Sequence, residues 1–178
     1  MHDAATFAEW LRMYVATQLT HTDALLMRLL YEGVDESHLA DLACAATLPA
    51  QVRTADIAMA KRIRTIGADA LGVPARGTEL AHPALEFAYV ARHFGVPLED
   101  AMTAHLTGAA STLTQNAVRG IPIGQSDGQR IITAAHEWVA RACADVHLLE
   151  EEDLGVVAPG LEIAQMQHER LRARMFMS

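Results

Sequence analysis

Residues 97–119 read PLEDAMTAHLTGAASTLTQNAVR, and this stretch decides the fold class. Apolar or small residues recur along it every three or four positions, at Leu98, Met102, Leu106, Ala110, Leu113 and Ala117. That period is typical of one face of an α-helix. Pro97 suits a helix start, and the acidic residues that follow suit the first turn. The run TGAAS at 107–111 contains only small residues, which favour close approach of another helix, so we expect this helix to lie centrally.

The rest of the chain repeats the helical period. Further helices are predicted at 6–31, with a bend or split near His21–Asp23, at 35–48, from 49 to a long loop at 71–82, at 83–94, at 126–149 and from 159 onward. Thr6 and Ser126 fit capping boxes with a Glu or Gln three residues later. There is no strand-like alternation. We therefore predict an all-α, single-domain helical bundle of about six to eight helices over residues 1–178.

Composition limits the possible partners. Of the 178 residues, 51% are hydrophobic and only 5% aromatic, so the core must consist of Ala, Leu, Ile, Val and Met. The formal charge of −8 makes nucleic acid a poor partner. No apolar run reaches the roughly 20 residues of a membrane span, and the N-terminus does not resemble a signal peptide. We expect a cytoplasmic protein whose two cysteines, Cys44 and Cys143, are reduced core thiols.

Histidine is abundant, with nine residues, but its spacing does not predict a metal site. His136-Glu137 and His168-Glu169 do not continue as His-Glu-x-x-His, because Ala140 and Arg172 occupy the last position. His105, in the middle of the apolar helix at 97–119, is expected to be a hydrogen-bonded core residue. We therefore predict no metal ligands, no cofactor and no tight site for a divalent transition metal.

The sequence also shows no catalytic motif. The acidic run 150–153 is best interpreted as a solvated, fraying helix end, since consecutive helical side chains point in different directions. No Gly-x-Ser-x-Gly elbow occurs. The glycines of 124–130 have the wrong spacing for a phosphate loop, and that segment has no Lys. We predict that the protein is not an enzyme.

Two segments are unusual for a purely structural helical domain. Residues 121–130, IPIGQSDGQR, form a polar, Gly-rich turn between two core helices, in which capping leaves Gln125 and Asp127 without a role. The C-terminal residues 168–178, HERLRARMFMS, combine three arginines with Met175, Phe176 and Met177. Such a terminus is either a frayed end or a docking tail.

These two segments resemble the urease accessory protein UreF family. Residues 122–130 are similar to its Pro-Leu-Gly-Gln-Thr-x-Gly-Gln-Arg segment. Residues 158–164, His168-Glu169 and 174–178 are similar to its Ala-Pro-x-Leu-x-Ile-Ala, His-Glu and terminal Arg-Leu-Phe-x-Ser elements. Arg172 replaces a common aromatic residue, and Met175 replaces Leu. The family's Pro-Val-Gly-x-Phe-Ser-like segment before the first helix has no counterpart, so we expect a shortened member or a truncated form.

The resemblance implies an all-α homodimer that acts as a non-catalytic scaffold in urease maturation. The implied partners are the accessory protein UreD (also called UreH), through it the GTPase UreG, and apo-urease, which receives nickel. On this basis residues 168–178 are expected to be a docking tail. The expected partner-binding residues are Gln125, Asp127, Gln129, Arg130, His168, Glu169, Arg174 and Phe176.

Two other functions stay open at this point. A helical metal-dependent hydrolase would need a convergent cluster of His and carboxylate side chains. A helical regulatory module unrelated to urease would need neither the cluster nor the two family-like segments.

Overall fold

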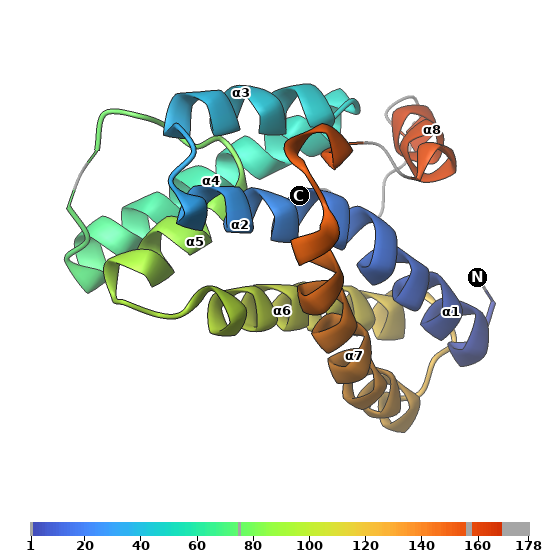
Figure 1. Cartoon of the computed structure of the whole chain (residues 1–178). Coiled ribbons are helices and arrows are strands. Elements are labelled where there is room, and N and C mark those ends of the chain that lie inside the picture. The colour runs from blue at the N-terminus through green and yellow to red at the C-terminus, as the bar shows by residue number, and fades with distance from the viewer. Residues whose placement is uncertain (1, 75, 156–157, 169–178) are drawn as a thin grey trace.

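The computed structural model describes residues 2–74, 76–155 and 158–168. Within these residues all regular structure is helical, which confirms the all-α prediction and the predicted number of helices (Figure 1). The α-helices are α1 (Ala4–Tyr14), α2 (Leu25–Glu32), α3 (Glu36–Ala46), α4 (Ala50–Leu71), α5 (Pro83–His93), α6 (Leu98–Gly120), α7 (Gln125–Asp145) and α8 (Pro159–His168). A π-helix, η1 (Val15–Ala24), joins α1 to α2, and two 3₁₀ turns, η2 (Val146–Leu148) and η3 (Glu151–Asp153), follow α7.

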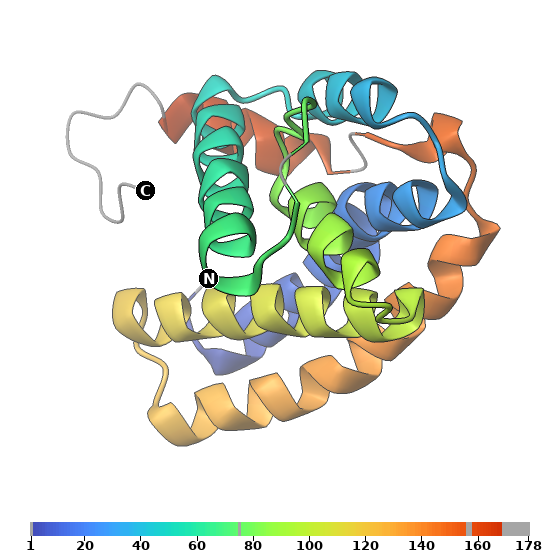
Figure 2. The ribbon, with the colours of Figure 1, turned by 90° about the vertical axis from the view of Figure 1, so that its left-hand side faces the viewer.

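Helix α6 packs against α7, α5, α2 and η1, in agreement with its predicted central position (Figure 2). Its buried face includes Met102, Leu106 and Ala110, and the core continues through fully buried leucines of α1, α2 and α5. The expected reason for its small residues is wrong at Gly108. This glycine is exposed, and a Cβ atom added to it would meet no atom within 4 Å. The small residues border a cleft there rather than a second helix.

The predicted interruption near residues 21–23 takes the form of a π-helix. Tyr14 and Leu25 at its two ends keep right-handed helical dihedral angles, so α1, η1 and α2 follow one another with no non-helical residue between them. The hydroxyl of Thr20 donates to the carbonyl of Val15 at 2.7 Å, five residues earlier. The hydroxyl of Thr22 donates to the carbonyl of Gln18 at 2.5 Å. π-Helical turns occur frequently at functional sites.

Two predicted helix starts differ from the structure. The carboxylate of Asp3, not the hydroxyl of Thr6, caps α1, and it accepts from the Thr6 amide at 2.8 Å. Helix α7 begins after Gly124 without a side-chain cap, so Ser126 already lies in the first turn.

Of the predicted core thiols, Cys143 is buried whereas Cys44 is only half-buried.

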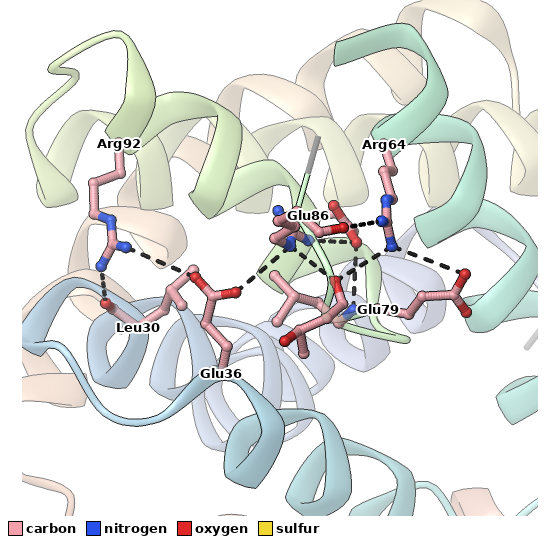
Figure 3. Close-up of polar contacts among 9 residues, drawn as sticks. Leu30, Glu36, Arg64, Glu79, Glu86 and Arg92 are labelled. Atoms are coloured by element: carbon pink, nitrogen blue, oxygen red, sulfur yellow. Dashed lines mark hydrogen bonds and ion pairs between the residues drawn. The ribbon is translucent and has the colours of Figure 1, made fainter. Parts of the chain in front are cut away.

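The long loop predicted at 71–82 occupies 72–82 and is held by ion pairs (Figure 3). One guanidinium nitrogen of Arg76 lies 2.6 Å from the buried carboxylate of Glu86 on α5, and another lies 3.6 Å from Glu36 on α3. The guanidinium also stacks 3.8 Å from the centre of the Tyr89 ring. Arg64 of α4 donates to the loop carbonyl of Thr78 at 3.3 Å. These contacts fix the loop against three helices.

The acidic segment after α7 is ordered rather than frayed. The Glu150 amide donates to the carboxylate of Asp153 at 2.8 Å, which closes the short turn η3.

In the described part of the chain, none of the helices combines the length and apolar character that crossing a membrane requires.

Candidate functional site

The α6–α7 junction positions four of the residues expected to bind a partner. Gln125 and Gln129 stand one turn apart at the start of α7 and line a depression of about 260 Å³ against α6. Asp127 and Arg130 form an ion pair at 2.5 Å, with most of the Arg130 side chain exposed. The junction therefore offers two amides at a groove and an adjacent pair of opposite charges to solvent.

Gly128 explains why α7 can lie so close to α6. It is buried, and an added Cβ atom would stand 2.8 Å from Cγ2 of Val118. Real Cβ atoms essentially never approach so closely, so a larger residue would push the two helices apart. The sequence interpretation assigned the neighbouring Ser126 and Gln129 to a cap and missed this packing role of Gly128.

The other predicted residues belong to a different part of the molecule. His168 is the last residue of α8, which packs on α4. Both views place α8 far from the start of α7 (Figures 1 and 2). The expected partner-binding residues Glu169, Arg174 and Phe176, with the rest of the tail, lie outside the described residues. The structure thus brings Gln125, Asp127, Gln129 and Arg130 together but does not bring His168 to them.

A larger cleft of about 520 Å³ opens between η1, α4 and α6, with α8 at one side. Its walls combine apolar side chains with ionisable ones. The ionisable residues that line it are Tyr14, Asp23, Asp56, His82, His105 and Glu162. None of these was singled out as a partner-binding residue from the sequence.

Asp23 and His105 form the best-defined polar pair of the cleft. Nε2 of His105 lies 2.7 Å from Oδ2 of Asp23, and both side chains are less than one fifth exposed. Burial is the largest single influence on Asp23 and would raise its pKa, but the hydrogen bond from His105 and the smaller effects of neighbouring groups together outweigh burial, so the pKa is lowered. The prediction that His105 is hydrogen-bonded is confirmed, but the residue is half-buried in the wall of the cleft rather than in the core. Its partner could not be predicted, because the two residues are 82 positions apart.

His82 stands at the end of the long loop and is buried in the same wall. Its Nδ1 accepts from the amide of Ala84 at 3.3 Å and so caps α5. Burial lowers the pKa of His82, and the partly opposing effect of Asp23 does not restore it. His82 is therefore neutral at neutral pH and supplies no positive charge to the cleft.

Three acidic groups of the cleft have raised pKa values. Burial, helped by the nearby carboxylate of Asp23, raises the pKa of Asp56 to about 7. Burial also raises the pKa of the Tyr14 hydroxyl, and the charges of Asp23 and Asp56 add to this effect. Glu162 of α8 is 4% exposed, its pKa is raised by burial, and its Oε2 has no hydrogen-bond partner among the described residues.

The residues that the structure describes contain no group of three or more His, Cys, Asp or Glu side chains that could hold a metal ion. Two histidines elsewhere in the described structure form isolated pairs with carboxylates. Nε2 of His38 lies 2.8 Å from Glu151, and Nε2 of His147 lies 2.6 Å from Glu99. The hydrogen bond to Glu151 raises the pKa of His38.

Comparison with known proteins relates these features to one family. A model of the UreF family matches residues 1–136. The urease accessory protein UreF of Arthrobacter sp. (strain FB24) is 45% identical over 187 residues, which cover 100% of this chain and 83% of the relative. This chain belongs to the UreF family. The UreF of Corynebacterium efficiens is 40% identical over 190 residues (100% and 83%), and that of Geobacillus kaustophilus is 39% identical over 187 residues (99% and 83%).

The UreF family model extends through the start of α7, so it includes Gln125–Arg130 and most of the cleft. Helix α8, with Glu162, lies beyond it. The relatives nevertheless align with the whole chain or nearly so, so the similarity extends beyond the last third of the sequence to all of it.

Proposed function

We propose that this chain is a non-catalytic scaffold in urease maturation. It binds UreD (UreH), and this complex recruits or regulates the GTPase UreG so that nickel is inserted into apo-urease. The observation that carries the proposal is the 45% identity, along the full chain, to a protein named urease accessory protein UreF. The protein acts in the cytoplasm as a homodimer, and nickel is the cargo of the assembly rather than a cofactor of this chain.

The start of α7 is the first proposed partner-binding surface. Gln125 and Gln129 border an open depression, and Arg130 is largely exposed beside Asp127. Amide and guanidinium groups in such a position can donate to carbonyl or carboxylate groups of another protein. Because Gly128 fixes α7 against α6, these side chains are presented from a rigid base.

The C-terminal tail is the second proposed surface. Its arginines bring positive charge to a protein with a net charge of −8, and Met175, Phe176 and Met177 are apolar anchors. His168, Glu169, Arg174 and Phe176 are the residues of this surface that we assign to partner binding. Of this surface the structure describes His168 alone, at the end of α8, and α8 lies far from the start of α7 (Figure 1).

A complementation experiment tests the proposal. A cell that carries apo-urease and the other accessory proteins but lacks its own UreF should regain urease activity when this chain is expressed. Deletion of residues 169–178 should abolish the recovery while the shortened chain stays folded. Inactive urease in the presence of soluble full-length chain would contradict the scaffold role.

Neither alternative is favoured by the family assignment. A metal-dependent hydrolase would turn over a substrate by itself, and a regulatory module unrelated to urease would leave the complementation experiment without effect. The proposed function differs from both in requiring UreD and UreG.

A further inference from the structure

We propose that the cleft between η1, α4 and α6 is a third docking site, which takes up an arginine or lysine side chain presented by a partner protein. This inference does not depend on the α7 surface or on the tail. It follows from the charges, the burial and the rim of the cleft.

The cleft contains negative charge without the cations that would balance it. Asp23, Asp56 and Glu162 line it, and among the described residues of its lining there is no Lys or Arg. Asp23 is paired with His105. His82 does not compensate for the other two acids, because burial lowers its pKa. Asp56 and Glu162 are therefore the groups for which a cation from another molecule would be the natural partner.

Two buried acceptors point to a missing donor. Oε2 of Glu162, on a residue that is 4% exposed, and Oε1 of Gln18 are both buried without a hydrogen-bond partner in the described structure. Both residues line the cleft. A buried acceptor without a partner costs about 1–3 kcal/mol. A guanidinium group has five N–H donors in a planar fork and could supply bonds to such acceptors, whereas a metal ion would need three or more converging ligands.

The rim of the cleft favours a protein as the source of the cation. The lining residue Met59 is 52% exposed, and the apolar side chains of Val52 and Ile63 line the same α4 wall. Exposed apolar side chains around a charged cavity suit a partner surface that places apolar residues beside its Arg or Lys.

The pH dependence of binding should follow Asp56. The groups that line the cleft with it are Tyr14 from α1, Asp23 from η1, His82 from the loop, His105 from α6 and Glu162 from α8. The pKa of Asp56 is raised to about 7, and only its ionised form attracts a cation. The affinity for a cation should therefore rise by roughly tenfold between pH 6 and pH 8.

The direct test uses N-acetyl-arginine amide and its uncharged analogue N-acetyl-citrulline amide as probes, followed by ¹H–¹⁵N NMR of the full chain. The arginine probe should shift the amide signals of Asp56, Gly108 and Glu162, with a dissociation constant on the order of 1 mM. The citrulline probe should bind at least about fivefold more weakly. Equal binding of the two probes, or arginine-induced shifts only outside the cleft, would overturn the proposal.

Matched variants separate the cleft from general electrostatic attraction. Asp56→Asn should weaken binding of the arginine probe by roughly tenfold, whereas Asp69→Asn removes the same charge at an exposed position of the same helix and should leave it unchanged. An equal loss of affinity for the arginine probe in both variants would mean that binding depends only on the net charge of the protein, and would contradict a specific site in the cleft.

Two further measurements decide the occupant. An acetylated and amidated Leu-Arg-Leu peptide should bind at least roughly threefold more tightly than Gly-Arg-Gly, because its leucines contact the apolar rim. Equal affinities would refute a docking site for a protein surface. A chain that ends at His168 should bind the peptide as the full chain does. A clear gain in affinity after this truncation would show that the chain's own tail competes for the cleft, and would overturn the assignment to a partner.

Discussion

Gly128 and Gly108 show how the same residue type serves opposite purposes on neighbouring helices. At Gly128 an added methyl group would stand 2.8 Å from Val118, whereas at Gly108 it would meet nothing within 4 Å. Alanine is favoured over glycine in a helix by about 1 kcal/mol, so the local preference is the same at both positions. Only the packing differs between the two positions, so packing decides whether an added methyl group stabilises or destabilises the fold.

We expect Gly128→Ala to lower the free energy of unfolding by about 1–2 kcal/mol, because overpacking outweighs the gain in helix propensity. Gly108→Ala should raise it by up to about 1 kcal/mol. Urea denaturation of both variants measures the difference. Stabilisation by Gly128→Ala would show that Val118 can move aside freely and that the close contact is not needed.

Asp56 gives a prediction about pH. Its ordinary pKa is 3.8 and its pKa in the folded chain is about 7, so between these values the folded chain holds a proton that the unfolded chain has lost. The contribution of Asp56 to stability is thus present below about pH 4 and falls as the pH rises to 7, by at most about 4 kcal/mol.

Asp56→Asn mimics the protonated carboxyl group at every pH and should remove this loss. The melting temperature of the variant should match that of the native chain near pH 4 and exceed it at pH 8. Asp69→Asn, at an exposed position of α4, is the control and should show no such widening gap. If the melting temperatures of Asp56→Asn and the native chain differed by the same amount at every pH from 4 to 8, the result would argue against a proton bound at Asp56.

At the level of elements, the loop 72–82 is the segment in which sequence and structure differ most in character. Its Gly and Pro content predicted an ordinary connection, but Arg76 ties it to α3 and α5, and Leu80 and His82 are buried. The loop therefore contributes Leu80 to the core and His82 to the wall of the cleft.

Arg76→Ala should lower the free energy of unfolding by about 3 kcal/mol, because it leaves the carboxylate of Glu86, which is 2% exposed, without its counter-charge. Arg62→Ala, at an exposed position of α4, should change it by less than about 0.5 kcal/mol. Urea denaturation of both variants checks this. Equal effects would mean that the loss of an arginine, rather than of this contact, determines the stability.

The helices could be predicted from the sequence because local patterns specify them. Pro83 and Pro97 mark the starts of α5 and α6 where they were expected. The π-helix could not be predicted beyond an interruption, since its form depends on packing against α6 and α7. The cap of α1 was misplaced because Asp3 and Thr6 are both good capping residues, and the extended backbone of Asp3 settles the choice.

At the scale of the whole molecule, three surfaces are candidates for contact with other proteins: the start of α7, the region of α8 and the tail, and the cleft beside η1. The first was predicted from Gln125–Arg130, which are close in sequence. The cleft was not predicted, because its residues come from six helical elements and two loops. Residues that converge only through tertiary structure leave no local pattern in a single sequence.

The central claim, that this UreF-family chain is a scaffold for urease maturation, is tested most directly by co-purification with UreD and UreG. Arg130 and Arg141 are both exposed arginines of α7 that pair with an acid one turn away, but only Arg130 lies at the α7 start. Arg141→Ala is therefore the matched control for Arg130→Ala. The account predicts that the native chain and Arg141→Ala retain UreD and UreG, whereas Arg130→Ala retains several-fold less. Failure of the native chain to retain either partner would contradict the account.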